Sequence, residues 1–240
     1  MNHESNQMDI KLELNIRRQP DDATCGPTCL HAVYRYYDDD ITLKQVMEDV
    51  TELESGGTLA VMLGLHALKR GYKAKLFTYN LQLFDPTWFA DGVNLRRKMS
   101  AQARVKSNPK LHTATRANLE FLERGGEMRL EDMEPSLLYR YLNRSIPILT
   151  GLSATYLYRT ARERGWDDEY DDVRGETSGH FVVLCGYDRQ KREILIADPL
   201  QGLRNNRERK YPVSVYRLIC AIMLGVLTYD GNLLIIEPHK

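Results

Sequence analysis

The chain has 240 residues, of which 42% are hydrophobic and 28% are charged, and this composition is ordinary for a globular protein with a full core. Its 33 Lys and Arg side chains balance its 33 Asp and Glu side chains. A net charge of zero argues against a nucleic-acid-binding protein and against a polybasic membrane-surface protein, because both need a basic excess.

The sequence also argues against membrane insertion and secretion. It has no run of about 18 apolar residues that could cross a bilayer. Its start, MNHESNQMDIKLEL, has neither the basic nor the apolar region of a secretory signal. The four cysteines are too few and too unevenly placed for a disulfide framework. We therefore expect a cytoplasmic protein with free thiols.

The first half of the chain predicts mainly helices. Residues 1–10 are expected to form a flexible stub, and the alternation in residues 11–16 predicts a strand. Apolar residues at three- and four-residue spacing predict a helix from about Gly26 to Tyr37, and Pro27 suits its first turn. The remaining expectations are a strand at residues 72–79 and helices at residues 42–50, 58–71, 94–106, 111–124 and 135–143.

The second half of the chain predicts mainly strands, so the fold class is α+β. We expect strands at residues 146–152, 180–187, 193–198 and 232–236, and a helix at residues 213–224. No linker divides the chain into two domains.

Cys25 is the first candidate for chemistry because the predicted helix begins beside it. Free N–H groups and the partial positive charge at a helix N-terminus stabilise a thiolate, which is the nucleophilic form of cysteine. The alternative is that Cys25 and Cys29, one turn apart, are small core residues.

His180 is the histidine best placed to act as a base. If the turn between the two β-rich runs is centred near Arg189, antiparallel pairing sets His180 opposite Asp198. A carboxylate there would orient the imidazole and stabilise its charged form. The alternative is a structural pair at the end of a strand. A zinc site made of Cys25, Cys29 and His31 is poorly spaced, so no metal and no cofactor is expected.

Gln19 lies in the loop before the predicted helix, six residues ahead of Cys25. Its side-chain amide, together with the backbone N–H of Cys25, could form a two-donor oxyanion hole. A glutamine in a loop is more often solvated surface, so only its position makes it a candidate.

Three blocks of the sequence together resemble a known family. They are residues 19–30 (QPDDATCGPTCL), 179–183 (GHFVV) and 196–199 (IADP). The blocks are similar to the signature motifs of the C39 peptidases, which are papain-like cysteine peptidases best known as leader-cleaving domains of bacteriocin exporters. The resemblance implies Cys25 as nucleophile, His180 as base, Asp198 as its orienting group and Gln19 as oxyanion donor. It also implies a papain-like fold, in which a helical part with the cysteine packs on an antiparallel sheet with the histidine and aspartate.

The chain also departs from the exporter domains. Thr24 precedes the cysteine where those domains usually have an acidic residue, and the membrane and ATPase segments are missing. We therefore expect a single C39-like domain at residues 11–240 with a large, mainly helical insert at about 40–145. Segments such as 56–60, 84–89 and 149–156 look like a stand-alone branch of the family.

Two other features stay open. The acidic run at residues 166–172 is typical of a solvated loop, but it precedes His180 by few residues and could rim the cleft and favour basic substrates. Tyr156 and Tyr158 alternate, and one of the two is expected to be a core aromatic and the other a surface aromatic.

The sequence thus predicts a cysteine peptidase or amidase that cleaves a peptide or amide bond through a thioester acyl-enzyme. Two alternatives remain, an acyl transferase that forms amide bonds on the same scaffold and a catalytically silent module that binds peptides. Neither the substrate nor the oligomeric state follows from the sequence.

Overall fold

The structure, a computed structural model, describes residues 8–53, 56–165, 169–200 and 209–239. A flexible stub was expected at residues 1–10, and residues 1–7 of it lie outside the described part of the chain. Ile10 begins the first strand. Residues 166–168 of the acidic run also lie outside the described part.

The described residues form an eight-stranded sheet with the order β3-β2-β8-β4-β5-β6-β7, and β1 pairs with β5 beside this path. The strands are β1 (Ile10–Lys11), β2 (Tyr72–Thr78), β3 (Glu127–Arg129), β4 (Ile148–Ser153), β5 (Gly179–Asp188), β6 (Glu193–Ala197), β7 (Lys210–Ser214) and β8 (Asn232–Pro238). Neighbouring strands are antiparallel except β2 and β3, which are parallel. The expected α+β class is confirmed, with one parallel pair at the edge of the sheet.

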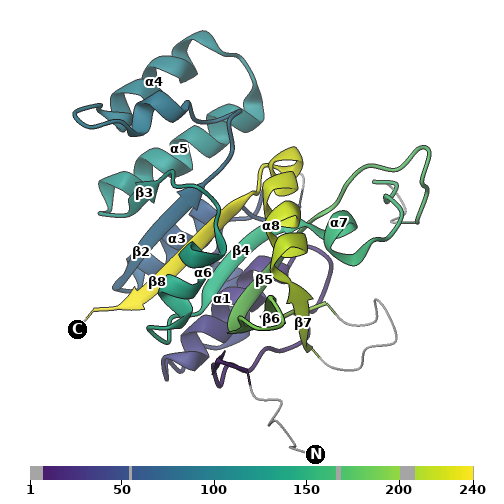
Figure 1. The fold of residues 1–240 in the computed structure, drawn as a ribbon. Coiled ribbons are helices and arrows are strands. Elements are labelled where there is room, and N and C mark those ends of the chain that lie inside the picture. Colours follow the sequence, from purple (N-terminus) through teal and green to yellow (C-terminus); the bar gives the residue numbers. More distant parts are fainter. Residues whose placement is uncertain (1–7, 54–55, 166–168, 201–208, 240) are drawn as a thin grey trace, which may run out of the picture.

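Helices cover both faces of the sheet. They are α1 (Cys25–Tyr36), α2 (Leu43–Asp49), α3 (Ala60–Lys69), α4 (Leu95–Val105), α5 (Pro109–Glu123), α6 (Pro135–Leu142), α7 (Ala154–Tyr158) and α8 (Val215–Leu224), with 3-10 turns η1 (Pro86–Phe89) and η2 (Gly225–Thr228). The helices α1 and α3 pack on one face, α6 and α8 pack on the other, and α4 and α5 stand beyond the β3 edge (Figure 1). Residues 40–145, where the sequence predicts a mainly helical insert, also supply β2 and β3.

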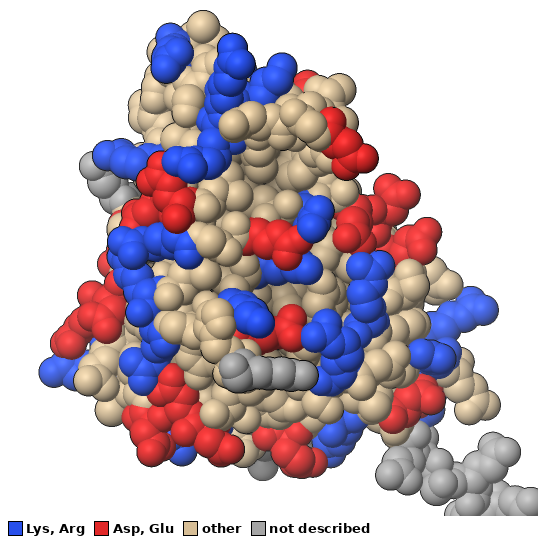
Figure 2. Space-filling view, turned by 90° about the vertical axis from the view of Figure 1, so that its left-hand side faces the viewer, with Lys and Arg blue, Asp and Glu red and all other residues tan. Residues whose placement is uncertain are grey.

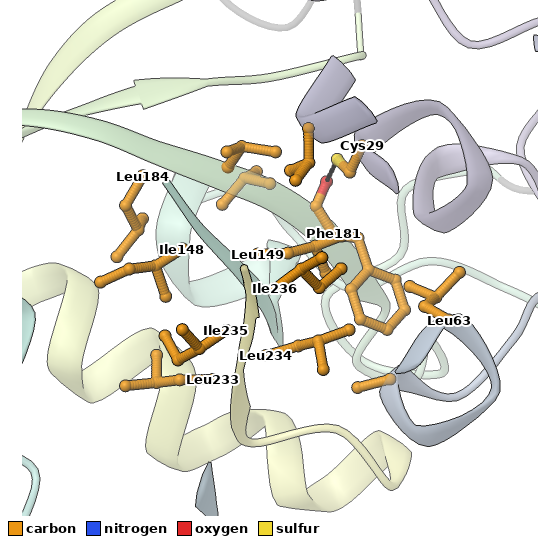
Figure 3. Close-up of a cluster of buried hydrophobic side chains, with 14 of the residues drawn as sticks. Cys29, Leu63, Ile148, Leu149, Phe181, Leu184, Leu233, Leu234, Ile235 and Ile236 are labelled. Atoms are coloured by element: carbon orange, nitrogen blue, oxygen red, sulfur yellow. Dashed lines mark hydrogen bonds between the residues drawn. The ribbon is translucent and has the colours of Figure 1, made fainter. Parts of the chain in front are cut away.

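The central strands are apolar because both of their faces are buried. All six residues of β4 are buried, and Leu149 pairs with Val183 of β5 and with Leu234 of β8. The sequence of a strand that is covered on both faces is a continuous apolar run and not an alternation of apolar and polar residues. Figure 3 shows this cluster, in which Leu63 of α3 lies near the ring of Phe181.

Side-chain caps fix the starts of several helices where the sequence predicts them. Thr42 and Gln45 form a capping box at α2, and the side chains of Asn94 and Asn108 cap α4 and α5. Each cap accepts a hydrogen bond from a backbone N–H that the helix leaves free.

Some predicted elements are shorter than expected or absent. Residues 11–16 were predicted as a strand, but only Lys11 of this segment lies in a strand. The apolar side chains of the segment are nevertheless buried in alternation, namely Leu12, Leu14 and Ile16. The helix predicted to begin at residue 213 begins at Val215, because residues 210–214 form β7. The short elements β3, β7 and α7 were not predicted.

Charges of both signs are interleaved on the surface. Figure 2 shows Lys and Arg side chains beside Asp and Glu side chains over one face, without a broad field of either sign. Some of them pair, as Lys75 does with Glu127 at 3.0 Å. In the part of the chain that the structure describes, no helix has the length and apolar character to traverse a bilayer.

Candidate active site

Cys25 is the first residue of α1, where the sequence places it. Its N-terminal neighbour Thr24 makes no side-chain bond to the helix, because its hydroxyl donates to the backbone oxygen of Asp21 instead. The positive end of the helix dipole is therefore left to act on the thiol of Cys25. The residue is 9% exposed, so the sulfur is largely shielded from water.

Gly26 allows α1 to pack closely on its neighbours. A Cβ added there would lie 2.6 Å from Cγ2 of Thr58 and 3.3 Å from the ring of Phe181. Because Phe181 follows His180 in β5, this close packing sets the distance between the start of α1 and the start of β5.

His180 and Asp198 lie together, although the pairing predicted between their strands is wrong. Val183 pairs with Ala197, and the register shifts between Leu184 and Gly186, where an irregularity interrupts the ladder. Continuing this register sets Asp198 opposite Val182, so His180 is its diagonal neighbour. The imidazole nevertheless reaches the carboxylate, and Nε2 of His180 donates to Oδ1 of Asp198 at 2.9 Å.

The carboxylate of Asp198 accepts three further hydrogen bonds. The hydroxyls of Tyr158 and Tyr211 donate to Oδ2 at 2.7 and 2.6 Å, and the backbone N–H of Leu200 donates to Oδ1 at 2.9 Å. Four donors around one buried carboxylate stabilise its charge and fix its orientation.

The ionisation of the pair follows from burial and mutual attraction. Burial alone would lower the pKa of His180, but the charge and hydrogen bond of Asp198, with a contribution from Cys25, raise it to about 10. Burial alone would raise the pKa of Asp198, but His180 and the two tyrosines hold it below its usual range. At neutral pH the pair is therefore an imidazolium and a carboxylate.

Gln19 is buried, so the expectation that a loop glutamine is solvated does not apply to it. Its backbone N–H donates to the oxygen of Pro199 at 3.0 Å, which ties its loop to the residue after Asp198. Its Nε2 donates to the oxygen of Asp21 at 2.9 Å. A primary amide has two N–H groups, so this bond leaves a second one.

Cys25 and His180 both line a cleft of about 700 Å³. Its walls come from distant parts of the chain, namely the residues before α1, the segment between α2 and α3, the first turns of α5, the start of β5 and residues 228–230. Residues 169–172, the described part of the acidic run, are not among its lining residues. The cleft is of the size that ligand pockets usually have.

A segment in the second half of the chain matches a known family. Residues 132–221, which include His180 and Asp198, match the family described as Peptidase_C39 like family. Cys25 and Gln19 lie outside the matched segment.

Solved structures of C39-like proteins are similar to this chain. A structure described as a C39-like peptidase from Bacillus anthracis has 13% identity and a TM-score of 0.53, and the match covers 98% of this chain and 100% of that one. This likeness shows the C39 papain-like fold, as the sequence predicted. The family match and this fold together indicate a cysteine peptidase-like enzyme.

Two peptidases of transporters are also among the similar structures. The double-glycine-motif protease of an AMS/PCAT transporter, solved with a leader peptide, has 14% identity, a TM-score of 0.46 and coverage of 96% of both chains. The peptidase domain of Streptococcus ComA, a bifunctional ABC transporter involved in quorum sensing, has 13% identity, a TM-score of 0.43 and coverage of 94% of this chain and 99% of that one. No curated protein matches this chain.

The other cysteines of this C39-like chain differ from Cys25 in their surroundings. Burial raises the pKa of Cys29 well above its usual range and that of Cys185 to about 12, so both stay protonated thiols. The thiol of Cys29 donates to the oxygen of Phe181 at 3.2 Å and joins α1 to β5 (Figure 3). Cys220 is exposed on α8. Among the described residues, no three His, Cys, Asp or Glu side chains are grouped as a metal site would need.

Sequence reasoning missed two residues of the C39-like site, Tyr158 and Tyr211. It expected one of Tyr156 and Tyr158 to be a core aromatic without deciding which, and it gave Tyr158 no partner. The sequence predicted no element at Tyr211, which lies in β7. Its contact with Asp198 depends on the unpredicted pairing of β7 with β6. The alternation around Tyr211 and Val213 was the signal available.

Proposed function

We propose that this chain is a cysteine peptidase or amidase in which Cys25, His180 and Asp198 act as a catalytic triad. The observation that carries the proposal is the ion pair of His180 and Asp198 at the same cleft as Cys25, which begins a helix. We also propose that residues 11–240 work as one domain, with a peptide or amide as substrate.

The attack begins from an ion pair. Nε2 of His180 is bonded to Asp198, so Nδ1 is left for the thiol of Cys25, and Cys25 is one of the groups that raise the pKa of His180. In this ion pair Nδ1 of His180 already holds the proton that Cys25 has given up, so the thiolate adds directly to the carbonyl carbon of the substrate. The raised pKa of His180 favours this ion pair before substrate binds.

Collapse of the tetrahedral intermediate breaks the C–N bond. His180 gives its Nδ1 proton to the leaving amine, and a thioester to Cys25 remains. His180 then takes a proton from water, the hydroxide adds to the thioester, and the acid leaves as the thiolate and imidazolium are restored. The backbone N–H of Cys25 and the second amide N–H of Gln19 hold the oxyanion in both halves.

Thiol labelling tests this proposal before any substrate is known. At low iodoacetamide concentration and neutral pH, Cys25 should be alkylated ahead of the other cysteines although it is largely buried, because the N-terminus of α1 and the imidazolium of His180 favour a nucleophilic sulfur. Cys220, which is exposed, is the internal control for access. Alkylation of Cys220 with Cys25 untouched, measured by peptide mass spectrometry, would favour a silent binding module.

Gln19→Ala should slow the chemical step and spare binding. Loss of one oxyanion donor typically lowers the rate by a factor of about 100–1,000. Acylation rate measured against substrate concentration should show this loss in the limiting rate, while the concentration at half-saturation changes little. Because Gln19 is buried, a melting curve must accompany the kinetics. An unchanged limiting rate would remove Gln19 from the mechanism.

Tyr158→Phe and Tyr211→Phe should each move the pH profile toward alkaline values. Each change removes a donor from Oδ2 of Asp198, so the carboxylate attracts the imidazolium more strongly and the pKa of His180 rises. The imidazolium then persists to higher pH, and the alkaline limb of kcat/KM shifts upward. Tyr156→Phe, on the same helix but 42% exposed, is the matched control and should leave the profile unchanged. Carbon-13 NMR of His180 reports the same shift without a substrate.

A further inference from the structure

A second, smaller cavity lies behind one wall of the cleft. It has a volume of about 20 Å³ and shares Leu59, Tyr229 and Asp230 with the cleft. Unlike a packing defect in an apolar core, it is bordered by polar side chains from three elements, including Asn80 after β2 and Asn118 on α5. A volume of this kind admits about one water-sized group.

Two asparagines each leave one polar atom of the cavity wall without a partner among the described residues. Asn80 uses Oδ1 to accept from the N–H of Gln82 at 3.0 Å, and its Nδ2 has no partner. Asn118 uses Nδ2 to donate to the oxygen of Ala114 at 2.8 Å, and its Oδ1 has no partner. Their exposed fractions are 2% and 3%, so bulk water does not satisfy these atoms. The bonds that the asparagines do make fix which end of each amide is free, namely one donor and one acceptor.

Asp230 supplies a third unpartnered atom, Oδ1, and is 6% exposed. Its Oδ2 lies 3.3 Å from Oγ1 of Thr228, which is itself 3.0 Å from the oxygen of Gly225. The hydroxyl of Thr228 is the donor in both contacts, and Gly225 is the closer acceptor. Burial raises the pKa of Asp230 to about 8, although the hydrogen bond from Thr228 and the charge of His180 act to lower it. Its Oδ1 is then a second acceptor that lacks a donor.

The three residues line one cavity and leave one donor, Nδ2 of Asn80, and two acceptors, Oδ1 of Asn118 and Oδ1 of Asp230. A single atom that satisfies all three must therefore donate two hydrogen bonds and accept at least one. A water molecule meets this requirement, whereas a hydroxyl donates once and an ammonium accepts nothing. The hydroxyl of Thr78, which also lines the cavity and accepts from the N–H of Asn80 at 3.4 Å, can give the fourth bond. Buried polar groups are rarely left unpaired, and buried waters typically make about three bonds.

We infer that this cavity is a binding site for one ordered water molecule, held by Nδ2 of Asn80, Oδ1 of Asn118 and Oδ1 of Asp230. The water joins two walls of the cleft, since Asn118 belongs to α5, which lines the cleft through Lys110 and Thr113, and Asp230 belongs to the segment at residues 228–230. It also keeps the carboxyl of Asp230 in place beneath the start of β5, because a Cβ at Gly179 would lie 2.7 Å from its Oδ2. The site does not depend on the proposed catalysis.

A high-resolution crystal structure of the full chain tests the site directly. We expect one fully occupied water within about 2.7–3.2 Å of the three named atoms. A dry cavity would overturn the inference. So would side chains rotated to bond one another, for example Nδ2 of Asn80 donating directly to Asp230.

A variant tests what the water does in solution. Asn118→Leu removes an acceptor and fills the cavity, so it should displace the water, raise the pKa of Asp230 measured by carboxyl carbon-13 NMR, and speed amide hydrogen exchange in both α5 and residues 228–231. Asn15→Leu, the same change at an exposed asparagine, is the control and should alter neither measurement. Faster exchange in α5 alone would show a local packing defect and would contradict a water shared by both walls. If Asn118→Leu does not fold, the wild-type crystal structure still decides the question.

Discussion

Replacing Cys25 by alanine is expected to abolish peptide cleavage while the fold persists. Loss of the nucleophile removes the only group that can form the proposed thioester, and in triad enzymes such a loss costs a factor of about 10⁶ in rate. Because the side chain of Cys25 is small and lies at the end of α1, its truncation leaves the packing of Gly26 against Thr58 and Phe181 intact.

A proteome-derived peptide library with mass-spectrometric detection of new termini measures this loss while the natural substrate is still unidentified. Cys220→Ala is the matched control, since it removes an exposed thiol on α8 and should leave every cleavage unchanged. Cleavages that persist in the Cys25→Ala protein at the wild-type rate would show that another group, or a contaminating peptidase, does the chemistry. New amide-linked products in place of new termini would indicate an acyl transferase.

Asp198→Asn is expected to lower the rate by a factor of about 10⁴, the scale seen when the orienting carboxylate of a triad is neutralised. Without the negative charge, burial decides the ionisation of His180 and lowers its pKa, so the imidazole is neutral and the thiol of Cys25 keeps its proton. Asp188→Asn, at the far end of β5, neutralises another buried acid and should retain activity.

The same substitution should change stability in a pH-dependent way. The raised pKa of His180 stabilises the fold fully below about pH 6.5 and ceases to do so as the pH rises toward 10. The lowered pKa of Asp198 stabilises the fold above about pH 4 and ceases to do so as the pH falls below it. The difference in melting temperature between wild type and Asp198→Asn should therefore be largest between about pH 4 and 6.5. A difference that is equally large at pH 10 would mean that lost packing, not lost charge, destabilises the variant.

The sequence could predict the parts of the site that depend on local pattern. Pro27 and the apolar spacing after it place Cys25 at the start of a helix, and this holds in the structure. The meeting of His180 with Asp198 was also predicted, but from a register that is wrong. The two side chains still meet because Asp198 lies one residue beyond β6, where His180 reaches it as a diagonal neighbour and not as a directly opposite one.

The remaining features depend on contacts that no local pattern reveals. Gln19 is buried because its loop docks on Pro199, a residue 180 positions later in the chain. Tyr211 reaches Asp198 only because β7 pairs with β6, and that pairing crosses a turn whose register the sequence does not specify. The polar cavity is likewise formed by Asn80, Asn118 and Asp230, which share no motif.

The place of β8 in the sheet has a consequence for when the cleft can exist during synthesis. It follows every other element in the chain, yet it lies between β2 and β4 and joins the two parts of the sheet. Residues 228–230, just ahead of it, form part of the cleft wall. A nascent chain that has not reached Pro238 therefore lacks both the strand that unites the sheet and the anchored residues 228–230 of the cleft wall. In this order of synthesis the cleft is completed only when β8 has paired with both β2 and β4.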